Sequence, residues 1–367
     1  MRVIQVKLSP SCSQITLLND LLEEHISLYN STLECKKILY ESFDGQKLSC
    51  FDAIKEIIPE FKKLGELKLA NYSSAQQTIR RLDKAFNRFF HGNGFPRFKN
   101  KDRFNTVEYG KYGDGCKIKK DKLYIQNIGL VKCLWYCDIN QKNIRTLSIT
   151  RKNDSFYVNF IVNEDKNIRI SFTNKNIGLD FGLKTFITTS DGEKYDSPKY
   201  LKKSLKRIKK ANRKLSRSPN KGSIEREKSK KVLNKIYTKI NNQRKDFNHK
   251  LSRKFVNEND IICIENIKLN NLVGNIKNIN RTYNDVSFGQ FRTFLIYKAE
   301  NAGKIIVKVN PFNTTKECHK CGRIVEKTLD ERVHKCECGC VEDRDINAAK
   351  NILRRGLASL ELAKANS

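Results

Sequence analysis

Hydrophobic residues in the first ninety positions follow two different spacings. Apolar and polar side chains alternate over residues 1–8, which predicts a β-strand. Apolar residues then recur at every third or fourth position in three segments, and this spacing predicts helices over 17–33, 51–64 and 74–90. Pro59 is expected to kink or shorten the second helix, because proline lacks the amide proton that an inner turn needs. The pattern therefore predicts a helical bundle that follows the first strand.

Short alternating segments replace the helical spacing between residues 97 and 163. Runs such as 122–125, 147–150 and 156–160 place apolar side chains at every second position, as the strands of a half-buried sheet do. We expect a β-rich domain here, a small barrel that the first strand completes.

From Asn176 onward, predicted strands and helices alternate to the end of the chain. The expected segments, in order, are strands over 177–182 and 184–189, a third short strand after a turn at 190–192, a basic helical region over 199–254 that turns back at 216–223, a strand over 260–265, a helix over 287–302, a strand over 304–309 and a helix over 343–360. This order resembles an RNase H-like α/β layer, in which the first strand is central and the fourth lies beside it. The whole chain is thus expected to be a multidomain α+β protein.

The charge balance adds a binding partner to this fold class. The chain has 367 residues with 72 Lys and Arg against 40 Asp and Glu, a net charge of +32. Residues 199–254 hold 22 of the basic side chains against three acids. Such an excess repels itself unless a polyanion is bound, which points to DNA, RNA or an anionic membrane. A solvated amphipathic hairpin is the alternative interpretation of residues 199–254.

A membrane partner is the weaker prediction. The chain has no run of 18 or more apolar residues, and residues 1–8 lack the apolar core of a signal peptide. We therefore expect a cytoplasmic, nucleoid-associated protein in a reducing compartment, where twelve cysteines are not a disulfide framework.

Three acidic residues stand in contexts that metal-dependent nucleases use. Asp180 lies in Ile-Gly-Leu-Asp-Phe-Gly, Glu265 ends the strand over 260–265, and Asp345 lies in Asp-Arg-Asp-Ile-Asn-Ala-Ala. In the RNase H-like order, Asp180 and Glu265 would be neighbours on adjacent strands, and Asp345 would close the site from the last helix. Converging carboxylates tolerate ionisation only with cations between them, and Mg²⁺ prefers oxygen ligands. The set therefore predicts a magnesium site that hydrolyses phosphodiesters.

Each acid also has a structural explanation when it is considered alone. Asp180 can form a turn, and Glu265 at a strand end can be solvated. Asp343 can cap the last helix, with Asp345 in the first turn, where the helix dipole favours a negative charge. The combination of all three, in this order, favours catalysis.

Cysteines cluster between the second and third acids, as two pairs separated by fourteen residues. Such pairs predict a structural zinc ribbon. The preferred ligands are Cys318, Cys321, Cys336 and Cys338. Cys340 leaves the fourth ligand open, and His319 and His334 are near enough to compete. The remaining cysteines are expected to be core or surface residues: Cys12, Cys35, Cys50, Cys116, Cys133, Cys137 and Cys263.

Several motifs resemble those of the TnpB family, the insertion-sequence-encoded, RNA-guided DNA endonucleases related to the type V CRISPR effectors. The matching stretches are Phe-Gly-Gln-Phe-Arg at 288–292, Tyr-Lys-Ala-Glu-x-x-Gly at 297–303, Pro-Phe-Asn-Thr-Thr-Lys-Glu-Cys at 311–318, Asp-Arg-Asp-x-Asn-Ala-Ala-x-Asn-Ile at 343–352, and weaker ones at 76–86 and 94–99. The resemblance covers nearly the whole chain and is most specific in its C-terminal half.

The resemblance implies a RuvC-type triad of Asp180, Glu265 and Asp345 that binds Mg²⁺, a structural Zn²⁺, and a guide RNA derived from the transposon end. It implies a monomer in the ribonucleoprotein that cuts double-stranded DNA beside a short motif. The implied domains are a wedge-like β-barrel over 1–11 and 93–170, a helical recognition bundle over 12–92, a RuvC-like nuclease over 171–313 and 343–360, a zinc ribbon over 314–342, and a disordered tail over 361–367. The shortened second cysteine pair departs from the family pattern.

Basic residues and one glutamine are the expected nucleic-acid contacts. Guide RNA and heteroduplex are bound through their phosphates, and glutamine can recognise adenine in the major groove. The predicted contacts are Gln76, Arg80, Lys206, Lys209, Lys210, Arg213, Arg244 and Lys245. Gln76 can equally be an ordinary exposed helix residue. Two other functions remain possible from the sequence: an RNA-guided DNA-binding repressor that does not cut, and a transposase that joins strands itself.

Overall fold

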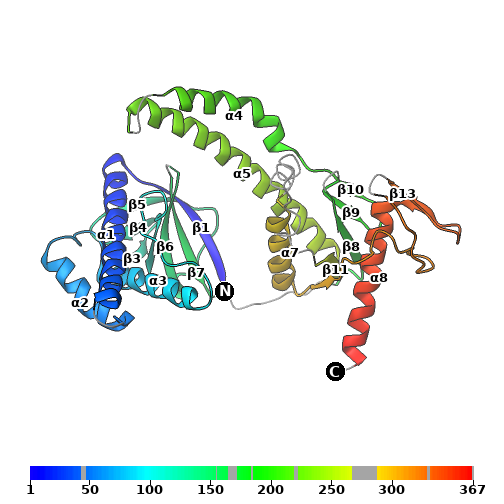
Figure 1. The fold of residues 1–367 in the computed structure, drawn as a ribbon, viewed down its shortest axis with the longest axis horizontal. Coiled ribbons are helices and arrows are strands. Elements are labelled where there is room, and N and C mark those ends of the chain that lie inside the picture. Colours follow the sequence, from blue (N-terminus) through cyan, green and yellow to red (C-terminus); the bar gives the residue numbers. More distant parts are fainter. Residues whose placement is uncertain are drawn as a thin grey trace. The chain divides into compact units, whose positions relative to one another are not determined.

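The chain divides into two compact units, Met1–Asp165 and Lys166–Ser367 (Figure 1). The structure is a computed structural model, and it describes residues 1–42, 47–153, 155–163, 172–182, 185–218, 222–266, 287–328 and 331–365. The predicted finer division into wedge, bundle, nuclease and zinc ribbon stays a prediction.

The first unit contains an antiparallel sheet in which the first strand of the chain is central. β1 pairs with both β7 and β5, so the predicted addition of strand 1 to the β-rich segment is confirmed. The strand order is β2-β6-β7-β1-β5-β4-β3. The strands are β1 (Arg2–Ser9), β2 (Thr106–Tyr109), β3 (Cys116–Lys119), β4 (Lys122–Ile125), β5 (Gly129–Leu134), β6 (Ile144–Lys152) and β7 (Ser155–Val162).

The sheet is a half-barrel rather than the closed barrel expected from the sequence. Among the described residues, the end strands β2 and β3 do not pair with each other. Helix α3 (Tyr72–Phe90) packs beside β2 instead, and Arg81 Nη1 donates a hydrogen bond of 3.1 Å to the Thr106 carbonyl. The amide of Gln77 takes the space at Gly110, just after β2. Helix α3 therefore lies beside β2, the end strand that would pair with β3 in a closed barrel.

The predicted helices form a bundle of α1 (Cys12–Ser42), α2 (Cys50–Lys63) and α3. Asn71 begins α3 by accepting a 2.8 Å hydrogen bond from the Ser74 amide. Pro59 lies inside α2, which continues for four residues beyond it. The expected shortening at Pro59 is therefore wrong, and a kink there stays a prediction. Helix α1 is longer than the periodicity indicated.

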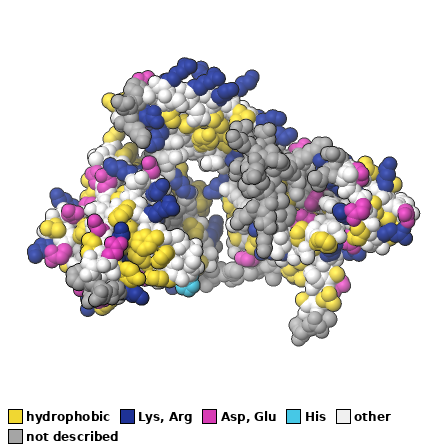
Figure 2. Space-filling view, viewed as in Figure 1, with side chains coloured by type: hydrophobic (Ala, Val, Ile, Leu, Met, Phe, Trp, Pro, Cys, Tyr) yellow, Lys and Arg dark blue, Asp and Glu magenta, His cyan; other side chains and the backbone are white. Residues whose placement is uncertain are grey.

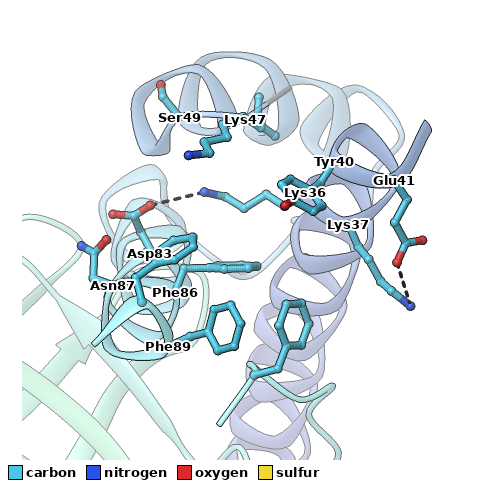
Figure 3. A pocket seen from close by; sticks show the side chains of 13 residues that line it. Lys36, Lys37, Tyr40, Glu41, Lys47, Ser49, Asp83, Phe86, Asn87 and Phe89 are labelled. Carbon is cyan, nitrogen blue, oxygen red and sulfur yellow. Dashed lines mark hydrogen bonds and ion pairs between the residues drawn. The ribbon is translucent and has the colours of Figure 1, made fainter. Parts of the chain in front are cut away.

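A pocket of about 500 Å³ lies between the C-terminal ends of α1 and α3 and the start of α2 (Figure 3). Aromatic rings, among them Phe86 and Phe89, form much of its wall. Lys36 pairs with Asp83 at 3.3 Å, so part of its positive charge is balanced within the wall. The pocket lies in the first unit, whereas the three candidate acids lie in the second.

The second unit contains a mixed sheet in the order β10-β9-β8-β11-β12. β8 is central and β11 lies parallel beside it, as the element order predicted. The strands are β8 (Asn176–Phe181), β9 (Ile187–Thr189), β10 (Lys194–Tyr195), β11 (Ile261–Glu265) and β12 (Ile305–Val309). The second predicted strand is shorter than expected, and its residue 184 lies outside the described residues.

Side-chain alternation gives this sheet two different faces. Ile177, Leu179, Ile262 and Ile264 pack with α5 (Ile224–Glu258) and α7 (Phe288–Ala302). Cys263 on the other face packs with α8 (Arg344–Ala365). Asp180 and Glu265 share the parity of the α8 face, so both acids point toward the helix that begins near Asp345.

Gly178 allows α8 to approach β8 closely. A Cβ at this position would lie 2.2 Å from the Ala349 carbonyl oxygen, which is backbone and cannot swing aside. We expect Gly178→Ala to lower the free energy of unfolding by about 1–3 kcal/mol through overpacking, measured by denaturant titration. Gly94→Ala is the matched control, because a Cβ at Gly94 meets nothing within 4 Å. Equal stability of the two variants would contradict this packing.

The basic segment forms a helical hairpin of α4 (Tyr200–Arg217) and α5, which turns where the sequence predicted. Figure 2 shows Lys and Arg side chains gathered along this hairpin. At the other end of the unit, α8 continues to Ala365, so the expected disordered tail over 361–367 is wrong for residues 361–365. Their Leu, Glu, Ala and Lys side chains are strong helix formers. In the part of the chain that the structure describes, no helix is both long and apolar enough to cross a membrane.

Candidate carboxylate and cysteine sites

Asp180 and Glu265 lie at the C-terminal ends of neighbouring parallel strands. The β8–β11 register pairs Leu179 with Ile264, so the two acids follow directly on both strands. Both side chains are buried, with 8% exposure for Asp180 and 7% for Glu265. The alternative of a solvated strand-end glutamate is therefore wrong.

Asp345 lies in the first turn of α8, and its neighbour Asp343 is the cap of that helix. Asp343 Oδ1 accepts hydrogen bonds from the amides of Asp345 at 2.9 Å and Ile346 at 3.3 Å. Asp343 also pairs with Lys194 at 2.6 Å. Asp345 instead has Arg344 Nε at 3.4 Å and lies close enough to Asp180 to affect its ionisation. Capping by Asp343 thus leaves Asp345 available to the other two acids.

Burial raises the pKa of Asp180 well above its usual range, and the negative charges of Glu265 and Asp345 raise it further. Arg344 and the Phe181 amide oppose this shift only in part. The pKa of Glu265 is also raised by burial, against the Thr314 hydrogen bond and Arg355.

This donor set suits a divalent cation, because a cation would relieve the repulsion that now favours protonation. The three acids are not among the groups whose ligand atoms all lie within 4.8 Å of one another.

The raised pKa of Asp180 gives a stability prediction. A carboxyl with a raised folded-state pKa contributes stability at low pH, and this contribution is lost as the pH rises through that pKa. At pH 8 in EDTA, we therefore expect Asp180→Asn to melt at a higher temperature than the wild type. Each 1 kcal/mol corresponds to about 2–4 °C for a unit of this size.

Mg²⁺ should reverse this order of melting temperatures, because it stabilises only the protein that binds it. Differential scanning fluorimetry of both proteins with and without Mg²⁺ measures the effect. A wild type that is the more stable protein in EDTA at pH 8 would contradict the electrostatic account.

The predicted zinc ligands lie close together in the segment over 314–342, which we call the cysteine module. The sulfur atoms of Cys318, Cys321, Cys336 and Cys338 all lie within 4.8 Å of one another. Cys318 lies 3.6 Å from Cys338, and Cys321 lies 3.6 Å from Cys336. Four thiol sulfurs this close match a tetrahedral zinc site.

Each cysteine pair lies in a tight turn. Gly322 donates from its amide to the Cys318 carbonyl at 2.9 Å and has φ 75°, and Gly339 donates to Cys336 at 3.0 Å with φ 81°. The second turn is flanked by a short antiparallel strand pair that was not predicted from the sequence, β13 (Val333–Lys335) and β14 (Val341–Asp343). Three-residue strands are too short for periodicity to reveal.

Cys340 belongs to a second, smaller group, in which its sulfur lies within 4.8 Å of ligand atoms of Cys318 and His334. His319 Nδ1 lies 3.8 Å from Cys340, and its ring also contacts Asn347 Oδ1 at 3.2 Å. The set that ends in Cys338 contains four thiols, so the geometry favours Cys338 as the fourth ligand.

Two buried side-chain amides of α8, neither of them predicted from the sequence to have a role, connect this helix to the cysteine module. Asn347 Nδ2 donates to the Glu317 carbonyl at 2.7 Å, and its oxygen accepts from the His319 amide at 3.0 Å. Asn351 Nδ2 donates to the carbonyls of Thr314 at 3.0 Å and Glu317 at 2.6 Å. Asn347 and Asn351 are four residues apart, so they lie on the same face of the helix that begins near Asp345. This spacing was the sequence signal that could have predicted their shared role.

The predicted nucleic-acid contacts fall on separate surfaces. Four of them line one open groove between α4 and the start of α5, together with Lys214, Arg217, Ser218 and Glu225: Lys206, Lys209, Lys210 and Arg213. On α5, Lys245 is exposed and Arg244 is half-buried. Gln76 and Arg80 lie on α3 in the other unit, half-buried and exposed respectively.

Two family models match the second unit and the residues just before it. One, described as "Probable transposase" (OrfB_IS605), matches residues 160–275, and the other, described as "Cas12f1-like, TNB domain", matches residues 288–352. Between them they include Asp180, Glu265 and Asp345.

Similarity to individual proteins agrees with the two family models. A Streptomyces pristinaespiralis protein named "Putative RNA-guided DNA endonuclease" is 29% identical over 360 residues, 92% of this chain and 87% of its own length. "TnpB-like protein L79" of Acanthamoeba polyphaga mimivirus is 30% identical over 57% of this chain and 42% of its own length.

Among solved structures, that of a Cas12f1-sgRNA-target DNA complex matches with a TM-score of 0.57 at 15% identity. The match covers 93% of this chain and 82% of that one, and it shows the likeness of the folds. The resemblance to the TnpB family that the motifs indicated is confirmed by these matches.

Proposed function

We propose that this chain is an RNA-guided DNA endonuclease of a transposable element, which uses a guide RNA to find complementary DNA and hydrolyses it. The observation that carries the proposal is the meeting of three acids from distant segments. Asp180 is buried beside β11, and both Glu265 and Asp345 act on its ionisation. A chain with net charge +32 that only bound DNA would gain nothing from three acids directed at one point.

In the proposed mechanism, Asp180, Glu265 and Asp345 would hold Mg²⁺ in a RuvC-type site. Bound divalent cations would stabilise the negative charge that develops on a phosphodiester during hydrolysis. The protein's own contribution is placement. The strand ends hold Asp180 and Glu265 side by side, and α8 brings Asp345. Burial of Asp180 and Glu265 keeps bulk water from screening the charges of these two acids.

The α4–α5 hairpin supplies the proposed surface for guide RNA and heteroduplex. Lys206, Lys209, Lys210 and Arg213 lie along one side of α4, so a phosphate backbone can follow the groove that they line. Gln76 would contact the duplex that carries the target-adjacent motif, as the resemblance implies, and Arg80 is a further proposed nucleic-acid contact on the same helix.

The cysteine module is proposed to hold Zn²⁺ in a closed site of Cys318, Cys321, Cys336 and Cys338. A closed four-thiolate site has no position for substrate, so its role is structural. Through Asn347 and Asn351, the module would fix the start of α8 and hence Asp345.

Two linked measurements test this function. RNA that co-purifies with the full chain is sequenced, and the ribonucleoprotein is then incubated with Mg²⁺ and a DNA that matches the guide part of that RNA. We expect one defined RNA and cleavage only of the matching duplex. Random cellular RNA together with no sequence-dependent products would contradict RNA guidance, and binding without products under any divalent metal would favour a repressor.

A further inference from the structure

We propose that Thr314 is a positioning residue that orients the Glu265 carboxylate and couples it to the cysteine module. The proposal rests on the proposed function only insofar as Glu265 is taken as a cation ligand. Thr314 is neither an acid nor a cysteine, and it lies between β12 and the first cysteine turn.

The contact itself is short and buried. Thr314 Oγ1 donates to Glu265 Oε1 at 2.6 Å, and the two residues are only 3% and 7% exposed. The same hydroxyl lies 3.2 Å from the Pro311 carbonyl, but it has a single proton to donate. Glu265 Oε1 is the nearer of the two acceptors, so it takes that proton.

Thr314 is itself held from α8. Asn351 Nδ2 donates to the Thr314 carbonyl at 3.0 Å, and Asn351 is fully buried. Asp345 lies on the same helix, less than two turns before Asn351. Helix α8 therefore carries Asp345, and it also holds the backbone of Thr314. The hydroxyl of Thr314 in turn orients Glu265.

The expected consequence is on cation affinity rather than on folding. Groups that hydrogen-bond to metal ligands and fix their orientation change metal affinity by about 10–100-fold when they are removed. Without the Thr314 hydroxyl, the Glu265 carboxylate can rotate about its last bond, and a cation must then order it on binding. We expect the cysteine module to keep its fold and its zinc when the Thr314 hydroxyl is removed.

The experiment measures Mn²⁺ binding to the full, zinc-loaded chain by electron paramagnetic resonance, without RNA or DNA. Thr314→Val, which keeps the shape and loses the hydroxyl, should bind Mn²⁺ about 10-fold more weakly than the wild type. Thr314→Ser, which keeps the hydroxyl, should bind within about 2-fold of the wild type. Thr315→Val makes the same change at the next residue and should leave Mn²⁺ affinity unchanged.

Zinc content and the circular dichroism spectrum are measured for each variant to show that the fold is kept. If Thr314→Val loses zinc, the Mn²⁺ affinity of Thr314→Ala, which also lacks the hydroxyl, is used instead. Wild-type Mn²⁺ affinity in a folded hydroxyl-free variant would overturn the positioning role.

Glu265→Gln separates this failure from a failure of the proposed function. If Glu265→Gln weakens Mn²⁺ binding and the loss of the hydroxyl does not, only the role of Thr314 is wrong. If Glu265→Gln also binds Mn²⁺ as the wild type does, Glu265 is not a cation ligand, and the positioning role and the proposed nuclease site are both overturned.

Discussion

Asp180→Ala is expected to reduce cleavage of a matching DNA duplex by at least about 10³-fold while RNA and target binding persist. Losing one cation ligand removes several kcal/mol of charge stabilisation, and about 4 kcal/mol corresponds to a factor of about 10³ in rate. Binding should persist because the groove that is proposed to hold the phosphates does not include Asp180. Cleavage of a labelled duplex by the ribonucleoprotein in Mg²⁺, with binding measured in EDTA, checks both parts.

Asp196→Ala is the matched control for this variant. Asp196 is an exposed acid in the same unit, just after β10, and its removal should leave cleavage unchanged. Asp180→Ala protein that cuts as well as the control would remove Asp180 from the mechanism.

Loss of zinc is expected to have the second large effect. Structural zinc contributes about 10–16 kcal/mol of apparent binding free energy in small zinc modules, so a module without it unfolds. Unfolding here would release the carbonyls that Asn347 and Asn351 hold and the hydroxyl that contacts Glu265. Cys321→Ser should therefore lose its zinc and most of its cleavage activity.

Zinc content by mass spectrometry, together with the cleavage assay, measures this effect. Cys35→Ser, at an exposed cysteine of α1, should retain both zinc and activity. Cys338→Ser should lose zinc and Cys340→Ser should keep it. The opposite result would make Cys340 the fourth ligand, and full activity in zinc-free protein would contradict the structural role of the module.

The sequence alone indicated much of the carboxylate site. The residue pattern predicted the strand over 177–182 that carries Asp180, and the element order correctly predicted β8 beside β11. Both inferences depend on local periodicity, which sequence carries directly. The motif around Asp345 also marked the start of a helix, although only the hydrogen bonds of Asp343 show which acid is the cap.

Other features depend on contacts that no local pattern encodes. The sheet of the first unit stays open because α3 lies beside β2, a contact that Arg81 makes with a residue distant in sequence. The bond between Thr314 and Glu265 joins residues 49 positions apart, and neither side chain is unusual for its segment. The helix over 361–365 was missed because an apolar periodicity fades where a helix has no core to contact.

The most direct test of the central claim is the location of a divalent cation. Crystals of the full chain with its RNA, soaked in Mn²⁺, would be used to compute an anomalous difference map. The account predicts a peak in contact with carboxylate oxygens of Asp180, Glu265 and Asp345 together. A Mn²⁺ peak elsewhere in the protein, with no density shared by these three side chains, would contradict it.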